Sequence, residues 1–216
     1  NAGSRPIDQQ QDTIVSPVDG TISATAPIRE DVIFQAKGLD YSLGDLLATD
    51  LDEARSFVNG NFATIYLAPY NYHRIHAPFA GELLAARFVP GDLFSVNQTT
   101  VAKVNGLFRR NERLVMQFKT EYGPAAVIFV GALNVGSITT PWSGEIRPRK
   151  KGVVEVLDLS RHSTSVEKGD LLGWFNMGST VILLLPNGAC DWDEGMQAGT
   201  TLRVGEVIGQ LLHAGG

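Results

Sequence analysis

The chain has 216 residues, and its hydrophobic share of 44% is enough to bury one large core or two small ones. A formal net charge of −5 argues against a nucleic-acid-binding protein, because such proteins present a basic surface to phosphates. No run approaches the roughly 18 apolar residues of a membrane-spanning helix. The single cysteine, Cys190, excludes an internal disulfide and a cysteine-based zinc site.

Short apolar runs predict a mainly β fold. In chain order, the predicted strands are residues 20–24, 62–67, 81–89, 114–120, 125–130, 153–157 and 179–185. Short peripheral helices are predicted at residues 42–48, where Ser42 can cap the first turn, and at 51–57, where Asp50 can do so.

The chain shows no linker-like segment, so we expect one domain over residues 5–216. Residues 1–4, Asn-Ala-Gly-Ser, are typical of an expression-vector remnant.

Two phrases recur along the chain. Pro-x-x-Gly-x-aliphatic begins at Pro17, Pro78 and Pro141, and it predicts a tight corner ahead of a strand. Gly-acid-aliphatic-aliphatic-Gly occupies residues 169–173 and 205–209. Both phrases resemble features of the barrel-sandwich hybrid folds of biotinyl carrier domains, so we expect a barrel-sandwich-hybrid-like β architecture.

A Gly178-Ser179-Thr180 sequence stands at the start of the last predicted buried strand. A serine that follows a glycine can attack the preceding carbonyl carbon with little hindrance, because glycine has no side chain and tolerates strained backbone angles. We interpret this sequence as a site where the chain cuts itself. An ordinary turn that enters the strand is the alternative.

Two of the four histidines, His73 and His76, lie three residues apart. They would share a face in a helix and point to opposite faces in a straight strand. Pro78 disfavours helix at Ala77, so we expect a short turn through Tyr72 and His73 that leads into an extended His76. The two rings then need not have the same role.

These polar residues also have structural interpretations. Each histidine can be a hydrogen-bonded residue at the rim of the core, and Asp19, in the first proline-glycine corner, can bind its own backbone. A zinc site built on His73 and His76 would need a third ligand at close spacing, and the sequence shows none.

Six motifs, in this order, resemble those of bacterial phosphatidylserine decarboxylases. They are residues 16–20 (SPVDG), 72–78 (YHRIHAP), 89–97 (VPGDLFSVN), 111–113 (NER), 130–132 (VGA) with 135–138 (VGSI), and 178–180 (GST). The resemblance covers nearly the whole chain from Arg5. One departure is Met177, where many bacterial members have leucine. Members usually also have an additional N-terminal membrane-associating segment, so we expect this chain to be the catalytic region without it.

The resemblance implies a self-processing, pyruvoyl-dependent enzyme. Asp19, His76 and Ser179 match the family's maturation triad, in which Asp19 orients His76 and His76 takes the proton from Ser179 Oγ. Ser179 then attacks the Gly178 carbonyl, and β-elimination of the resulting ester leads to a pyruvoyl group at the former Ser179.

The resemblance also implies the mature reaction. The amine of phosphatidylserine would form a Schiff base with the pyruvoyl group, which accepts the electrons of the departing carboxylate. Phosphatidylethanolamine is then released. His73, the other histidine of the motif, is the candidate acid that protonates the α-carbon. The two fragments, residues 1–178 and 179–216, are expected to stay together, and a homodimer is considered.

A lipid substrate implies a peripheral enzyme at the membrane surface, expected on the cytoplasmic side. Phe88, Leu93 and Phe94 are candidates for exposed apolar side chains near the pocket. The basic residues of the run 147–151 are expected in a solvated loop that could also contact anionic headgroups.

Two other classes of function are considered. A hybrid-motif carrier or binding module fits the repeated corners, but no lysine stands at a Met-Lys-like hairpin tip. A metallohydrolase would use His73 and His76. An esterase loses its usual support, because Ser179 lacks a Gly-x-Ser-x-Gly context.

Overall fold

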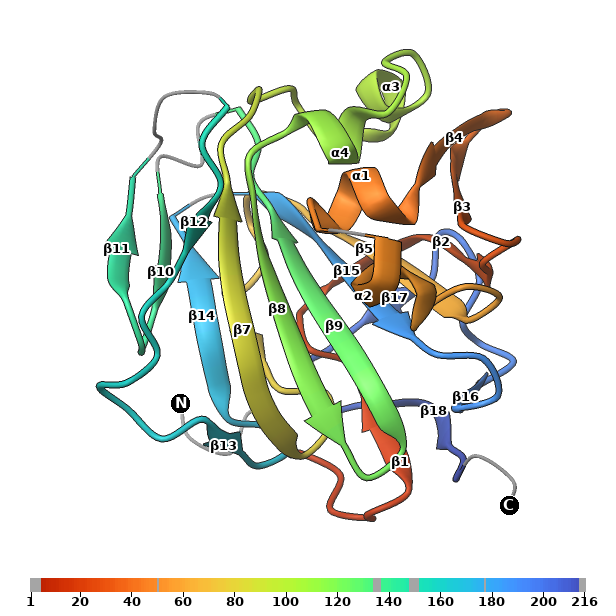
Figure 1. The fold of residues 1–216 in the computed structure, drawn as a ribbon. Coiled ribbons are helices and arrows are strands. Elements are labelled where there is room, and N and C mark those ends of the chain that lie inside the picture. The colour runs from red at the N-terminus through yellow and green to blue at the C-terminus, as the bar shows by residue number, and fades with distance from the viewer. Residues whose placement is uncertain (1–4, 50, 134–136, 148–151, 177, 214–216) are drawn as a thin grey trace.

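The structure of the protein, a computed structural model, describes residues 5–49, 51–133, 137–147, 152–176 and 178–213. These residues form β-strands β1 to β18 and four helices of four or five residues each (Figure 1). The prediction of a mainly β fold with a few short helices is therefore confirmed. The described sheets are open, and none of them closes into a barrel.

A nine-stranded sheet forms the body of the molecule. Its order is β12-β7-β8-β9-β15-β5-β2-β17, with β13 also paired to β7, and every pairing is antiparallel. The strands are β2 (Gly20–Pro27), β5 (Asn61–Leu67), β7 (Gly81–Val89), β8 (Arg113–Thr120), β9 (Gly123–Val130), β12 (Glu155–Val156), β13 (Ser165–Val166), β15 (Ser179–Leu185) and β17 (Thr201–Leu202).

Three smaller sheets accompany it, in the orders β11-β10-β14-β6, β1-β18-β16 and β3-β4. Their strands are β1 (Thr13–Val15), β3 (Val32–Ala36), β4 (Leu39–Ser42), β6 (Arg74–His76), β10 (Ile138–Thr140), β11 (Gly144–Ile146), β14 (Leu171–Phe175), β16 (Cys190–Trp192) and β18 (Val207–Leu211). The helices are α1 (Leu43–Leu47), α2 (Leu51–Arg55), α3 (Gln98–Val101) and α4 (Leu107–Arg110).

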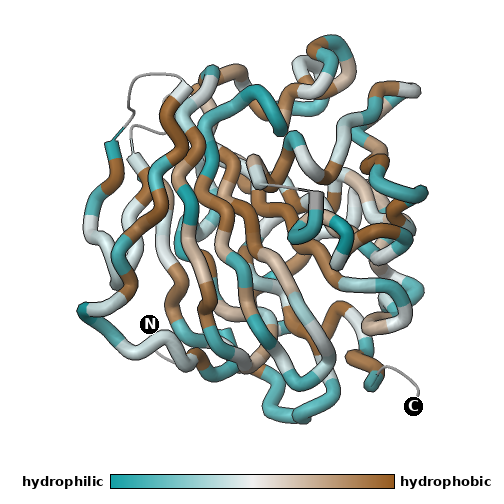
Figure 2. The backbone as a smooth tube through the Cα atoms, in the orientation of Figure 1, coloured by the Kyte–Doolittle hydropathy of each residue, from teal (hydrophilic) through white to brown (hydrophobic). Residues whose placement is uncertain are grey.

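The core packs against both faces of the large sheet, and Figure 2 shows hydrophobic residues concentrated along its central strands. On one face, the rings of Phe129 in β9 and Phe175 in β14 have centroids 5.7 Å apart. On the other, α1 is held to β8 because Arg113 Nε donates to the Leu46 carbonyl at 2.6 Å. Burial on both faces explains why all seven residues of β15 are buried.

Six of the seven predicted strands are present with small differences at their ends. The exception is the run 153–157, of which only Glu155–Val156 forms a strand, β12, at the edge of the large sheet. Val153, Val154 and Val156 are 64%, 44% and 68% exposed, so most of this run lies on the surface, and only its last residue, Leu157, is buried in the core. Short strands such as β6, β14 and β18 were not predicted, because two to five residues show too little periodicity.

Both predicted helices are present. Ser42 caps α1, since its side chain accepts a hydrogen bond from the Asp45 amide at 3.2 Å. Asp50, the predicted cap of α2, lies outside the described residues. Helices α3 and α4 were not predicted. Among the described residues, no helix is long and apolar enough to cross a membrane.

The three proline-glycine phrases are corners, as predicted. Their glycines, Gly20, Gly81 and Gly144, are the first residues of β2, β7 and β11. Two of these corners also hold each other: the His76 amide donates to the Pro17 carbonyl at 2.9 Å, and the Val15 amide donates to the Pro78 carbonyl at 3.0 Å. This reciprocal pair brings the corner that contains Asp19 against strand β6.

The two Gly-acid-aliphatic-aliphatic-Gly phrases occupy equivalent places. Gly169 and Gly205 have φ values of 91° and 88°, which glycine adopts without strain, and each precedes a strand, β14 or β18. Side-chain atoms of Ile7 lie within 2.9 Å of the position that a Cβ would take at either glycine. The repeat in the sequence therefore corresponds to a structural repeat around Ile7.

Candidate active site

Ser179 is the first residue of β15, and it is fully buried opposite Leu67 of β5. Its Oγ has no hydrogen-bond partner among the described residues. A buried hydroxyl without a partner costs about 1–3 kcal/mol, so its retention calls for a functional reason. The preceding Gly178 is tightly enclosed: a Cβ there would lie 3.0 Å from the Leu67 carbonyl oxygen.

A surface cavity of about 240 Å³ opens beside Gly178. The residues that line it come from four loops and from β5; they are Tyr66, Pro69, Ser95, Val96, Asn97, Ala132, Leu133 and Gly178. The cavity therefore reaches Gly178, the residue directly before the buried Ser179.

Asn111 fixes two walls of this cavity, a role that the sequence analysis did not assign. Its side chain accepts from the Phe94 amide (3.0 Å) and donates to the carbonyls of Phe94 (2.9 Å) and Gly131 (2.9 Å). It thereby joins the segment 93–97 to the segment that follows β9. The residue belongs to the Asn-Glu-Arg motif, so the motif was the available signal.

His73 lies on the loop that touches Gly178. Its Nε2 is 2.9 Å from the Pro69 carbonyl, and the Pro69 nitrogen is 3.2 Å from the position of a Cβ at Gly178. Its Nδ1 is buried without a partner among the described residues. Two polar atoms in this region, Ser179 Oγ and His73 Nδ1, are therefore buried without a hydrogen-bond partner among the described residues.

His76 is extended in β6, as predicted, but the turn before it lies earlier than expected. The Asn71 amide donates to the Ala68 carbonyl at 2.9 Å, so the chain turns at residues 68–71 rather than at Tyr72 and His73. The Asn71 side chain reinforces this turn by accepting from the Ala68 amide at 2.7 Å. That local hydrogen bond is the physical reason for the shift.

The His76 ring is held by two partners. Nδ1 is 2.7 Å from the Gly169 carbonyl, and Nε2 is 3.1 Å from the Tyr72 hydroxyl. Burial is the main reason that the pKa of His76 is lowered from its ordinary value, so the neutral ring is favoured. Because a carbonyl can only accept, the proton is on Nδ1, and Nε2 accepts from Tyr72.

Asp19 is paired with Arg5. Its carboxylate accepts from Arg5 Nε (3.0 Å) and Nη2 (2.7 Å) and from the Val204 amide (3.0 Å). Burial acts to raise the pKa of Asp19, but these hydrogen bonds outweigh it and the pKa is lowered. The Arg5 guanidinium also lies 4.2 Å from the centre of the Tyr72 ring, so Asp19, Arg5, Tyr72 and His76 form one cluster.

The structure thus brings the predicted site residues together in two groups. Gly178, Ser179 and the loop that carries His73 form the first, beside the cavity. Asp19 and His76 belong to the second, and none of the hydrogen bonds among the described residues joins either of them to Ser179. Their predicted action on Ser179 stays a prediction.

Glu112 is a second residue to which the sequence analysis gave no role. It is only 2% exposed, and burial raises the pKa of its carboxyl to about 7. A buried carboxyl whose pKa is raised toward neutrality is typical of functional sites.

The prediction that Phe88 is an exposed, membrane-facing residue is wrong, because Phe88 is fully buried in β7. Its position in the strand turns its ring into the core. Leu93 and Phe94 are half-buried. The exposed apolar side chains near the cavity are instead those of Leu133 (59%), which lines it, and Tyr70 (88%), which follows the lining residue Pro69.

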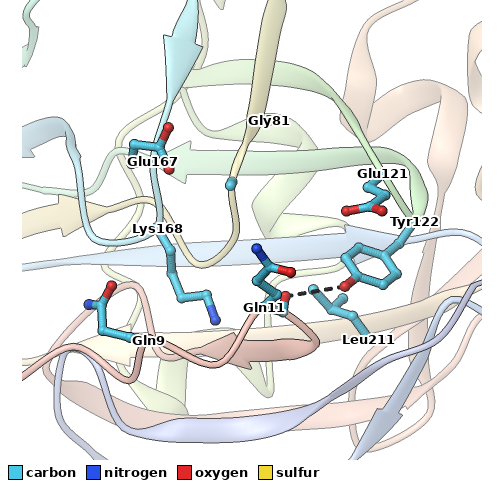
Figure 3. Close-up of a pocket in the computed structure, with 9 residues that line it drawn as sticks. Gln9, Gln11, Gly81, Glu121, Tyr122, Glu167, Lys168 and Leu211 are labelled. Atoms are coloured by element: carbon cyan, nitrogen blue, oxygen red, sulfur yellow. Dashed lines mark hydrogen bonds between the residues drawn. The ribbon is translucent and has the colours of Figure 1, made fainter.

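A separate hollow of about 470 Å³ lies at the other end of the large sheet (Figure 3). Tyr122, which lines it, directly precedes the first residue of β9. Ser179 instead lies near the last residue of β9, because Thr180 pairs with Val130. The Tyr122 hydroxyl donates to the Gln11 carbonyl at 3.2 Å there.

The described residues contain no group of three His, Cys, Asp or Glu placed to hold a metal ion.

Comparisons with known proteins show which family the chain resembles. The sequence model of the family "Phosphatidylserine decarboxylase" matches residues 1–210. A phosphatidylserine decarboxylase proenzyme of Saccharophagus degradans is 48% identical over 208 residues, which are 96% of this chain and 73% of the relative. One of Psychrobacter cryohalolentis is 49% identical over 207 residues, 95% of this chain and 73% of the relative.

Proposed function

The chain belongs to the phosphatidylserine decarboxylase family, and we propose that it converts phosphatidylserine to phosphatidylethanolamine after cutting itself between Gly178 and Ser179. The observation that carries the self-processing part is the buried, unpartnered Oγ of Ser179, which directly follows an enclosed glycine beside a cavity. The word proenzyme in the names of the relatives supports a precursor that is processed.

Maturation begins at Ser179 in this proposal. Its Oγ forms a bond to the Gly178 carbonyl carbon, the bond from that carbon to the Ser179 nitrogen breaks, and the nitrogen takes a proton. Removal of the α-proton of Ser179 then breaks its Cβ–Oγ bond and frees the carboxylate of Gly178. Residue 179 is then a dehydroalanine at the start of the small fragment. Its hydrolysis releases ammonia and leaves a pyruvoyl group.

The residues present fit such a group, because it would be made from Ser179 itself, whose side chain has no structural hydrogen bond that its loss would break. When present, a pyruvoyl group supplies a carbonyl that accepts electrons during decarboxylation. His73 is proposed to deliver a proton in turnover, which is supported by its place on the loop that contacts Gly178. His76 and Asp19 are assigned to maturation on the family resemblance alone.

The two fragments would stay together after cleavage. β15 lies between β9 and β5 in the large sheet, and it pairs with β5 along all seven of its residues. The small fragment therefore supplies a central strand, and its loss would expose a fully buried core segment. A bilayer substrate further implies a peripheral enzyme whose cavity faces the lipid, which the exposed side chains of Tyr70 and Leu133 support.

Intact-mass measurement tests the proposal. Wild-type protein should give two fragments, one ending at Gly178 and one that starts with the altered residue 179, and should release carbon dioxide from phosphatidylserine. Ser179→Ala should remain one chain without activity, whereas Ser165→Ala, at an exposed serine of β13, should behave as wild type. A wild-type protein that stays uncut and is nevertheless fully active would overturn the pyruvoyl mechanism.

A further inference from the structure

Residues 5–8 pack against both Gly-acid-aliphatic-aliphatic-Gly phrases at their first glycines. Side-chain atoms of Ile7 lie 2.9 Å and 2.8 Å from the positions that a Cβ would take at Gly169 and Gly205. The Asp8 amide donates to the Gly205 carbonyl at 3.2 Å. A side chain at either glycine would displace this segment, so the segment is seated closely on both phrases.

Each phrase also lies beside one of the two residues assigned to maturation. The Gly169 carbonyl accepts from His76 Nδ1 at 2.7 Å. The Val204 amide, directly before the second phrase, donates to the Asp19 carboxylate at 3.0 Å. Residues 5–8 therefore pack on the backbone that holds both side chains.

Arg5, at the start of this segment, contacts Asp19 and supports His76 through Tyr72. Its Nε and Nη2 donate to the Asp19 carboxylate at 3.0 Å and 2.7 Å, and such a paired contact fixes the orientation of a carboxylate. Its guanidinium carbon lies 4.2 Å from the centre of the Tyr72 ring. The Tyr72 hydroxyl is 3.1 Å from His76 Nε2, and the two rings stack.

We infer that Arg5 is a positioning residue for self-cleavage, which holds Asp19 directly and His76 through Tyr72. The inference rests on the proposed function, in which Asp19 and His76 keep the maturation roles that the family resemblance gives them. Arg5 itself exchanges no proton, because a guanidinium keeps its charge throughout the range in which histidine titrates. Its link to both residues carries the inference, since an ion pair with Asp19 alone would contribute only to stability.

The charge of Arg5 also acts on His76. Burial is the main cause of the lowered pKa of His76, and the hydrogen bond to the Gly169 carbonyl opposes it. Of the charged groups nearby, Arg74 and Arg5 lower this pKa further and Asp170 raises it. A histidine must be neutral before it can take a proton. Loss of the Arg5 charge should therefore raise the pKa of His76 and leave less of the neutral ring at a given pH.

The test follows the cleavage of freshly made precursor, produced by brief cell-free translation, between about pH 5 and 8. The wild-type rate should rise with pH and then level off, as His76 becomes neutral. Arg5→Gln should lower the plateau rate by about 10²-fold, the loss expected when a catalytic group is misplaced by about 1 Å. It should also move the midpoint of the rise to higher pH.

Arg5→Lys separates charge from geometry. Lysine keeps the positive charge but cannot make the paired contact with the Asp19 carboxylate. We therefore expect a plateau rate between those of wild type and Arg5→Gln, with the midpoint of wild type.

Control variants separate this role from a structural one. Arg55→Gln removes an arginine that pairs with Asp52 where both side chains are at least 73% exposed, and it should cut as wild type. Arg5→Gln and Arg5→Lys in the uncleavable Ser179→Ala background should keep the circular dichroism spectrum of folded protein. If Arg5→Gln does not fold, Arg5→Lys decides, and a wild-type rate of that variant would overturn the inference.

The outcomes are distinguishable. If wild type cuts and Arg5→Gln cuts at the same rate, or slowly but with an unchanged midpoint, the positioning role of Arg5 is overturned and the proposed function stands. If wild type itself never cuts, the proposed self-processing fails.

Discussion

Tyr72 holds His76 in a fixed orientation: its hydroxyl is 3.1 Å from Nε2, and the two rings stack with centroids 5.8 Å apart. The other ring nitrogen is hydrogen-bonded to the Gly169 carbonyl, so both nitrogens of His76 are engaged. His73, three residues earlier, has one nitrogen without a partner among the described residues. The two histidines of one short motif thus stand in different environments.

Substitution of these histidines should affect different steps. From the family resemblance, we expect His76→Ala to block cleavage. His73→Ala should still be cut but turn over more slowly by about 10²- to 10⁴-fold, because a proton donor for the substrate is lost. Gel analysis and carbon dioxide release on the same preparations measure both steps. The assigned roles would be reversed if His73→Ala stayed uncut while His76→Ala matured normally.

The pair formed by Arg5 and Asp19 should stabilise the fold in a pH-dependent way. Because the folded-state pKa of Asp19 is lowered, its contribution is present above the unfolded value and lost as the pH falls through the folded value. Asp19→Asn should lower the free energy of unfolding at pH 7 by about 1–3 kcal/mol, and the difference from wild type should shrink below about pH 4.

Denaturant unfolding at pH 7 and pH 3 measures this effect. Asp52→Asn is the matched control, since Asp52 pairs with Arg55 where both side chains are at least 73% exposed. It should change stability by less than about 1 kcal/mol. Equal effects of the two substitutions would show that partial burial adds nothing to the Arg5–Asp19 pair.

The contribution of Glu112 to stability should depend on pH in the opposite direction to that of Asp19. Its folded-state pKa is raised to about 7, so folding disfavours the carboxylate, and stability falls as the pH rises from the ordinary glutamate value through 7. Glu112→Gln in the Ser179→Ala background should therefore be more stable than its parent at pH 8, by about 1–3 kcal/mol, and gain less at pH 5. Thermal unfolding at both values tests this; a gain that is the same at pH 5 and pH 8 would contradict it.

The exposed apolar side chains at the rim of the cavity should contribute to activity on phosphatidylserine in membranes. Leu133→Ser and Tyr70→Ser each replace an exposed apolar side chain. We expect them to lower activity on phosphatidylserine in vesicles several-fold and to leave activity on a dispersed short-chain substrate unchanged. Leu84→Ser, at an apolar residue of β7 that is 57% exposed and does not line the cavity, is the control. A loss on both substrates would place the two residues in catalysis rather than in lipid contact.

Much of the fold follows from local sequence. The long strands were predicted because β7, β8, β9 and β15 carry seven to nine residues of suitable pattern, and the corners because proline and glycine restrict or relax the backbone at fixed positions. The apolar run 153–157 was misjudged, since its hydrophobicity alone does not show that it lies at a sheet edge.

The sequence by itself determined the family, the order of the motifs and the candidate cleavage point, because these depend on residue types in linear order. Only the tertiary structure decided which of them meet. It joined Asp19 to Arg5 and His76 to Tyr72, and it packed the Glu112 side chain against Gly131. The reason is that strand register, which aligns residues tens of positions apart, is fixed by the pairing of whole strands and not by the residues of any one motif.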